Sequence, residues 1–119
     1  MSLMAYAFPI ERGKTSAWRK WADELNGERQ REFAASRERV GVHERTFLQE
    51  TPQGDLVIVT LEGDDPAGAF AKMMERSDPF TTWFLEHVKE FHGIDPAEMA
   101  RTASPVLMVD SAAVPVAAR

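Results

Sequence analysis

The stretch His43–Gly63, HERTFLQETPQGDLVIVTLEG, decides the fold because it predicts two strands joined by a tight turn. Strand-forming residues dominate Val42 to Glu50 and again Leu56 to Glu62. Between them, residues 51–55, TPQGD, supply the proline and the glycine that favour a turn. The stretch therefore predicts an antiparallel β-hairpin.

The chain before the hairpin predicts one strand and one long helix. Residues 3–10 are apolar and include aromatic side chains suited to a strand. A helix then begins near Thr15 or Ser16, either of which can cap free N–H groups, and apolar residues continue at helical spacing to Val40. The pair Asn26-Gly27 can end one helix or be tolerated within it. We favour a single long helix, with or without a kink, that ends before Gly41.

Asp-Pro pairs mark the helices that follow the hairpin. Those at 65–66 and 78–79 predict helix starts, because proline is tolerated in a first turn, and Gly93 ends the second helix. A short turn begins at Asp95, Ser104 to Asp110 predicts a last strand, and residues 111–119 form a tail. The order strand, helix, strand, strand, helices, strand predicts a ferredoxin-like βαββαβ sandwich. This is an α+β fold with a four-stranded antiparallel sheet and its helices on one face.

Length and composition limit the classes of protein to consider. The 119 residues fit one domain spanning residues 1–119, of which residues 1–3, before a second methionine, are interpreted as a cloning addition. The net charge of -5, without a long basic block, argues against nucleic acid as a partner. No apolar run approaches the ~20 residues that span a bilayer. The absence of cysteine fits a reducing compartment, and we expect a cytoplasmic protein.

The predicted strands are apolar on both faces. In the second hairpin strand Val57, Val59 and Leu61 point one way, and Leu56 and Ile58 point the other. Helices can cover only one of these faces, and a large exposed apolar patch is unusual on a monomer. We therefore predict a homodimer in which a second copy covers the other face. The alternative is that the tail folds back over its own sheet.

The hairpin and the stretch SDPFTTWFLEHVKEFHGID at 77–95 together resemble a family of uncharacterised bacterial proteins. That family belongs to the dimeric α/β-barrel superfamily, which includes antibiotic-biosynthesis-type monooxygenases and stress-responsive barrel proteins. The resemblance covers roughly residues 42–95. It implies a dimeric α/β barrel and a small-molecule enzyme or binding protein without a cofactor, but it brings no established reaction.

The helix predicted to start at Pro79 carries two histidines. His87 lies in the apolar stripe of Phe80, Phe84 and Phe91, so it is either a core histidine bonded to a neighbouring group or a pocket base. His92 ends the helix, where it either interacts with the helix dipole or belongs to a site.

Other polar residues are fewer and more scattered. His43 and Glu44 point to opposite faces of one strand, and the sequence leaves open which face is inward. We predict no metal site, because His87 and His92 lie on different sides of their helix and no HxH or HExxH spacing occurs. Trp18 and Trp21 are predicted to pack in the core.

Two functions are consistent with these observations. The first is a metal-free and cofactor-free protein that binds or transforms a small organic molecule in a cavity between helices and sheet. Its lining residues would be His43, Glu44, Trp83, His87 and His92. The second is a non-catalytic dimeric assembly module. Whether the protein is an enzyme is left open.

Overall fold

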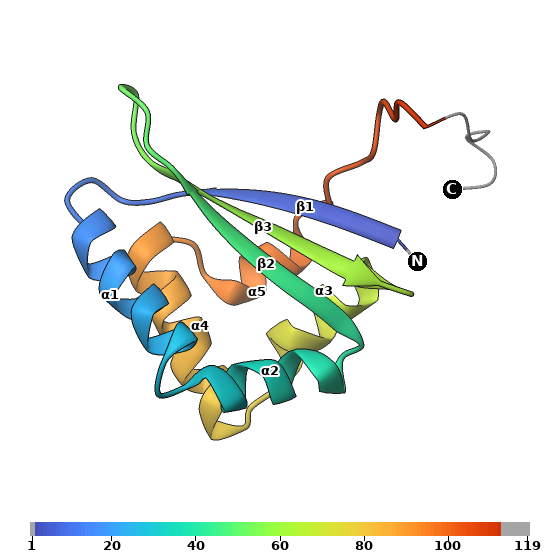
Figure 1. Ribbon diagram of the computed structural model, residues 1–119, viewed down its shortest axis with the longest axis horizontal. Coiled ribbons are helices and arrows are strands. Elements are labelled where there is room, and N and C mark those ends of the chain that lie inside the picture. The colour runs from blue at the N-terminus through green and yellow to red at the C-terminus, as the bar shows by residue number, and fades with distance from the viewer. Residues whose placement is uncertain (1, 113–119) are drawn as a thin grey trace.

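The computed structural model describes residues 2–112 and places all helices on one face of an antiparallel sheet (Figure 1). Within these residues the sheet has three strands, and five helices cover it. The elements are β1 (Ser2–Pro9), α1 (Thr15–Asn26), α2 (Gln30–Arg39), β2 (Val42–Gln49), β3 (Leu56–Gly63), α3 (Pro66–Glu75), α4 (Pro79–His92) and α5 (Pro96–Arg101).

The predicted α+β class and the predicted hairpin are confirmed. β2 pairs antiparallel with β3 from Val42 opposite Gly63 to Gln49 opposite Leu56, and β1 pairs with the other edge of β3. The strand order is therefore β1-β3-β2, with β3 in the centre. This register turns Glu44 of β2 toward the helices, beside Leu61 of β3, and turns its neighbour His43 to the outer face.

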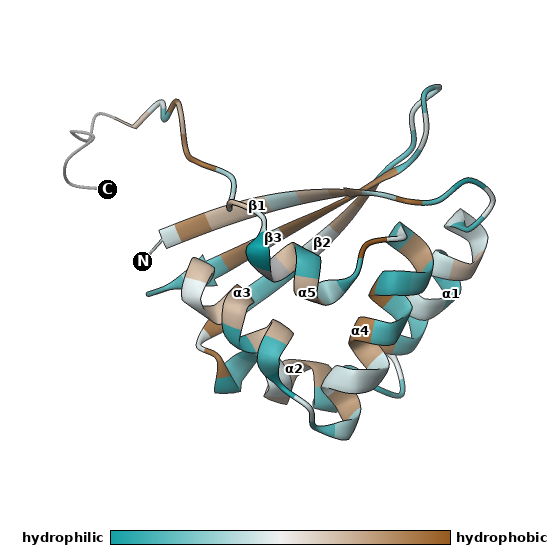
Figure 2. Cartoon of the chain, turned by 180° about the vertical axis from the view of Figure 1, so that it is seen from behind, coloured by the Kyte–Doolittle hydropathy of each residue, from teal (hydrophilic) through white to brown (hydrophobic). Residues whose placement is uncertain are grey.

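The predicted four-stranded ferredoxin-like sheet is wrong, because residues 104–110 do not form a strand. This segment passes β1, where Ser104 Oγ lies 3.5 Å from Tyr6 Oη, and then runs away from the helices (Figure 2). Pro105 in the segment and Pro9 in β1 each lack the N–H that a strand ladder needs. Moreover, the helices cover only one face, so a fourth strand with apolar residues on both sides would still expose half of them to water. Residues 113–119 of the predicted tail lie outside the described residues.

The prediction of one long helix from Thr15 to Val40 is also wrong. α1 ends at Asn26, and the N–H groups of Gly27 and Arg29 both donate to the carbonyl oxygen of Glu24, at 3.2 and 3.0 Å. The chain turns there, and α2 begins at Gln30. The break allows α2 to pack against β2 instead of continuing along the direction of α1 (Figure 1).

Aspartates cap the two helices whose starts the Asp-Pro pairs at 65–66 and 78–79 predicted, and also α5, where only a short turn was predicted. The side chains of Asp65, Asp78 and Asp95 each accept a hydrogen bond from a backbone N–H in the first turn of α3, α4 and α5. Gly93 ends α4 in the left-handed conformation, with φ of 66°, which glycine adopts without the steric cost that a Cβ would add.

The core lies between the inner face of the sheet and the helices. One cluster of buried residues joins α1, α4 and α5 to β3 and includes Trp18, Trp21, Val57, Phe91 and Met99. A second cluster joins α3 to all three strands. Across residues 2–112, no helix combines the length and the hydropathy that crossing a bilayer requires.

Candidate functional site: a cavity between sheet and helices

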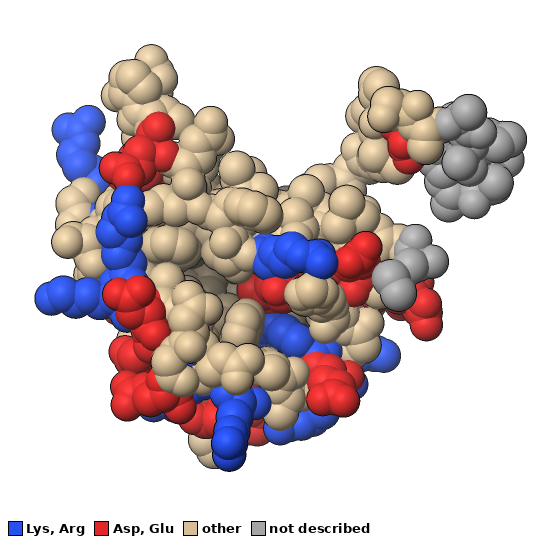
Figure 3. Space-filling model, in the orientation of Figure 1, with Lys and Arg blue, Asp and Glu red and all other residues tan. Residues whose placement is uncertain are grey.

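A cavity of about 280 Å³ separates the helices from the inner face of the sheet. Figure 3 shows a hollow on the surface between α1 and β2, with charged side chains beside it. All three strands and all five helices contribute to the lining. Most of the lining is apolar, and its aromatic members are Phe8, Trp18, Trp21, Phe33, Phe70 and Phe84.

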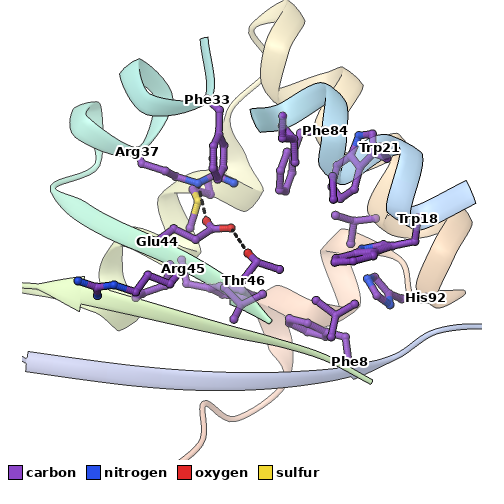
Figure 4. A pocket seen from close by; sticks show the side chains of 18 of the residues that line it. Phe8, Trp18, Trp21, Phe33, Arg37, Glu44, Arg45, Thr46, Phe84 and His92 are labelled. Carbon is purple, nitrogen blue, oxygen red and sulfur yellow. Dashed lines mark hydrogen bonds and ion pairs between the residues drawn. The ribbon is translucent and has the colours of Figure 1, made fainter. Parts of the chain in front are cut away.

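A buried ion pair forms one side of the cavity (Figure 4). Arg37 Nε donates to Glu44 Oε1 at 2.6 Å, and the two side chains are only 6% and 5% exposed. The hydroxyl of Thr46 donates to the other carboxylate oxygen at 3.3 Å, and Arg37 Nη1 donates to Ser36 Oγ at 2.9 Å. Both charged groups therefore have partners, as burial requires.

Two phenylalanine rings hold the Arg37 guanidinium. Its central carbon lies 4.8 Å from the ring centre of Phe33 and 4.5 Å from that of Phe84. Such contacts favour a planar cation over an aromatic face. The break between α1 and α2 makes this arrangement available, because it brings the helix that carries Phe33 and Arg37 against β2.

His92 lies at another side of the cavity, close to Phe8 (Figure 4). Its Nδ1 is 2.8 Å from the carbonyl oxygen of Pro9. A carbonyl only accepts, so Nδ1 carries a proton, and Nε2 of the neutral ring is left as an acceptor. Burial lowers the pKa of His92 by more than the hydrogen bond to Pro9 raises it. His92 is thus a neutral hydrogen-bond acceptor and weak base at pH 7.

Trp18 and Trp21 of α1 form an aromatic wall of the cavity. Each is 6% exposed, and each indole N–H is buried without an acceptor among residues 2–112. Buried polar groups nearly always have a hydrogen-bond partner. These two donors are therefore buried in the packing around the rings, and among residues 2–112 they have no hydrogen-bond partner.

The five residues predicted to line a cavity do not meet at one place. Glu44 and His92 both line the cavity described here. His43 is exposed on the outer face of the sheet, opposite Glu62 on β3. Trp83 and His87 belong to α4 but not to the lining.

His87 does not line the cavity but contacts Trp21, which does. Its Nδ1 is 2.8 Å from the carbonyl oxygen of Trp83, one helical turn earlier. Its ring stacks on Trp21, with centroids 5.7 Å apart and planes 7° from parallel. Trp83 in turn lies under the guanidinium of Arg29, 4.0 Å from its ring centre. His87 therefore supports the position of Trp21, and only one of the three histidines lines the cavity.

Sequence reasoning missed Arg37 and assigned the two tryptophans of α1 to packing alone. Arg37 follows Phe33 by four residues and precedes Val40 by three, so a charged residue interrupts an apolar helix face. A charged residue on an apolar helix face can indicate a buried ion pair. The sequence did not show that Glu44 lies opposite Arg37, so this interpretation could not be made from it. Trp18 and Trp21 do pack in the core, but they also border the cavity.

Other types of site find less support. Among residues 2–112, no group of three histidine, aspartate or glutamate side chains is placed to hold a metal ion. Comparison of the chain with protein-family models, with curated proteins and with solved structures found no match in any of the three. The resemblance to the uncharacterised bacterial family stays a prediction.

Proposed function

We propose that the protein binds a small organic molecule, without a metal, in the cavity between helices and sheet. The cavity itself carries the proposal, since about 280 Å³ is close to the lower end of ligand pockets, roughly 300–1,000 Å³. Its composition fits as well, because ligand pockets combine apolar walls with a few placed polar groups. Here those groups are the Arg37–Glu44 pair and His92.

His92 is the residue on which a reaction would depend if the bound molecule is transformed. Its hydrogen bond to Pro9 fixes the ring and leaves Nε2 to accept a proton. A general base in that position would act on a hydroxyl or on an acidic C–H group of the ligand. Binding alone requires only that Nε2 accept a hydrogen bond.

Replacing either of two alanines on α1 by phenylalanine tests whether the cavity is a binding site. Ala22 lines the cavity, whereas Ala17 on the same helix is exposed. A library of small ring compounds should raise the melting temperature of the wild type and of Ala17→Phe, but not that of Ala22→Phe, whose added ring fills the cavity. Compounds that stabilise Ala22→Phe as strongly as the wild type would place binding elsewhere, and the proposal would fail.

We further propose that the protein is a homodimer whose partner covers the outer face of the sheet. Leu3 of β1 and Phe47 of β2 are 59% and 52% exposed on that face. Residues 106–109, VLMV, are 58–85% exposed and lie away from the helices (Figure 2). One chain thus has two apolar surfaces that do not cover one another, and a two-fold arrangement allows each to pack on a second copy.

The oligomeric state tests this second proposal. Sedimentation at micromolar concentration should give about twice the chain mass of 13.4 kDa. Phe47→Glu should shift the protein to monomers, while Ala34→Glu, on the exposed side of α2, should not. A monomeric wild type would refute the proposal, and so would a Phe47→Glu protein that dimerises as tightly as the wild type.

The dimer also supports the alternative function, a non-catalytic assembly module. The two functions differ in one outcome: a module needs the outer face but not the cavity. If Ala22→Phe matches the wild type in every binding assay while Phe47→Glu loses assembly, the module is favoured. The lack of cysteine fits a cytoplasmic location, which stays a prediction.

A further inference from the structure

We propose that the ligand of this cavity is an uncharged aromatic ring compound whose hydroxyl group donates a hydrogen bond to Nε2 of His92. This inference rests on the proposed binding function and names the ligand class of that same site. Three features of the cavity lead to it, namely an open acceptor, balanced charge and aromatic walls.

His92 supplies the open acceptor. Its Nδ1 donates to the carbonyl oxygen of Pro9 at 2.8 Å, which fixes the ring and leaves the lone pair of Nε2 free. Among residues 2–112, the indole nitrogens of Trp18 and Trp21 are the only buried side-chain nitrogen or oxygen atoms that are both closed to water and without a partner, so Nε2 is open. His92 lines this cavity but not the smaller one of about 200 Å³ beside β1. A ligand in this cavity can therefore reach Nε2.

The acceptor selects a donor on the ligand. A neutral imidazole nitrogen accepts from an O–H or N–H group and gains nothing from a carbonyl or an ether oxygen. Of the neutral donors that an aromatic ring carries, a hydroxyl is the stronger, because its O–H is more acidic than the N–H of an amine. An aromatic hydroxyl is therefore the group that matches Nε2 best.

The charge balance of the cavity argues against an ionic ligand. Glu44 and Arg37 neutralise one another at 2.6 Å, and the guanidinium of Arg45 lies 3.3 Å from Glu62. His92 is neutral at pH 7 because burial lowers its pKa. A buried ligand charge would therefore find no free opposite charge here, at a large desolvation cost.

The surroundings of His92 indicate a flat ring system. The ring of Phe8 lies 5.6 Å from that of His92, and Trp18 of α1 lies beside them (Figure 4). Phe33 and Phe84 add aromatic carbon to the lining from α2 and α4. Such walls favour stacked or tilted rings. A cavity of about 280 Å³ accommodates one or two fused rings rather than a larger ligand.

Three compounds with the same two-ring skeleton test the hydroxyl. 5-Indanol carries an O–H, 5-methoxyindane keeps the oxygen but not its hydrogen, and indane lacks both. One added hydrogen bond should make 5-indanol bind about fivefold to tenfold more tightly than either of the others, measured by calorimetric titration. 5-Aminoindane, which is a weaker donor, and the anion indane-5-carboxylate should both bind more weakly than 5-indanol.

The ring nitrogens of His92 give a direct readout in the wild type. In ¹⁵N-labelled protein the chain's three histidines give ring signals that single substitutions assign. An aromatic O–H is a stronger donor than water, so 5-indanol should shift the Nε2 signal of His92 upfield. Indane and 5-methoxyindane exclude water without replacing its hydrogen bond, so they should shift the same signal downfield. The signals of His43, on the outer face, should not move.

A pair of variants gives a second readout. His92→Phe keeps a ring at this position and removes the acceptor, so the preference for 5-indanol over 5-methoxyindane should disappear. His43→Phe is the matched control, because His43 does not line the cavity, and it should retain the preference. If His92→Phe does not fold, the nitrogen shifts in the wild type still decide the outcome.

Each result decides the inference. A downfield shift of Nε2 with 5-indanol, or a preference for 5-indanol that persists in folded His92→Phe, would overturn it. Tighter binding of the amine or of the carboxylate would overturn the choice of a neutral hydroxyl. Failure of all three neutral indanes to bind would overturn this ligand class, whereas other compounds blocked by Ala22→Phe would still support the proposed function.

Discussion

Glu44→Gln should destabilise the protein far more than any change of charge on its surface. The substitution keeps the size of the side chain and removes only its charge. Arg37 would then be a buried cation that keeps Ser36 Oγ and two phenylalanine faces but loses its counter-ion. An unpaired buried charge is among the more costly changes in a folded protein.

The structure sets the magnitude of this loss. Breaking a buried ion pair by removing one partner costs roughly 3–5 kcal/mol. Arg37 and Glu44 are 6% and 5% exposed, which is the range to which that figure applies, but the adjacent cavity offers room for water near the pair. We therefore expect the lower end, about 3 kcal/mol of unfolding free energy. For a chain of this length that corresponds to a fall in melting temperature of roughly 12 °C.

The neighbouring pair Arg45–Glu62 provides the control. It also joins β2 to β3, with its atoms 3.3 Å apart, but its side chains are 47% and 37% exposed. Glu62→Gln should therefore cost about 0–1 kcal/mol. The double variant Arg37→Met/Glu44→Leu, which removes both charges, should recover most of the stability lost in Glu44→Gln.

Urea unfolding followed by circular dichroism measures all four proteins on one scale. If Glu44→Gln and Glu62→Gln cost the same, water would have to solvate the Arg37–Glu44 pair in the folded state. The argument from burial would then be refuted. The double variant separates this case from a general intolerance of substitution at residue 44, which would leave it as unstable as Glu44→Gln.

Three further outcomes are expected. The folded pKa of His92 lies below its ordinary 6.5, so the unfolded chain takes up the proton first. The free energy of unfolding present above pH 6.5 should therefore fall as the pH is lowered through the folded pKa. This loss should be smaller in His92→Gln than in the wild type or in His43→Gln, the control at an exposed site. Equal pH profiles of the three proteins would contradict this expectation. Gly93→Ala places a Cβ at a φ of 66° and should cost about 1–2 kcal/mol, measured by urea unfolding, and an unchanged midpoint would argue against that conformation. Asp78→Ala removes the carboxylate that accepts from the N–H of Thr81, so it should lower the stability of the protein by about 1 kcal/mol, with faster amide exchange in the first turn of α4; unaltered exchange there would show that the cap is dispensable.

Local patterns predicted the hairpin and the helix starts well, because each depends on residues close in sequence. The strands Val42–Gln49 and Leu56–Gly63 end within one residue of the predicted bounds, since the turn residues and the strand-forming runs agree. The Asp-Pro pairs at 65–66 and 78–79 were equally informative, because one carboxylate and one ring set the first turn without help from the rest of the chain. The third pair, at 95–96, begins a helix where a short turn was predicted.

The errors arose where an element depends on distant partners. Residues 104–110 have a strand-like composition, but a strand requires an edge with free N–H and C=O groups and cover for both faces. The break at Asn26-Gly27 was visible in the sequence, yet its outcome depended on the packing of α2 against β2. Composition alone could not predict these two outcomes, because tertiary packing is stronger than the local preference of a segment for helix or strand.

The set of residues that line the cavity could not be predicted from the sequence for a related reason. Glu44 was a candidate only until the strand face was known, and the register of β2 with β3 determined that face. Arg37 and Trp18 belong to other elements, and nothing in their spacing shows that they border the same space as Glu44. For His87 the sequence left two alternatives, and the structure shows the first of them: a histidine among aromatic residues, bonded to the carbonyl oxygen of Trp83, whose ring contacts Trp21 from outside the cavity.

The position of β1 at the edge of β3 affects the order in which the protein folds and the way in which the cavity can open. β2 finds β3 across one short turn, whereas β1 must reach β3 across α1, α2 and the whole hairpin. Closing that long loop is entropically slower, so β1 should join after the hairpin and the adjacent α2 have formed. β1 also carries Phe8 and the carbonyl of Pro9, which orients His92. A transient detachment of β1 from β3 would therefore open the cavity while the β2–β3 hairpin stays folded.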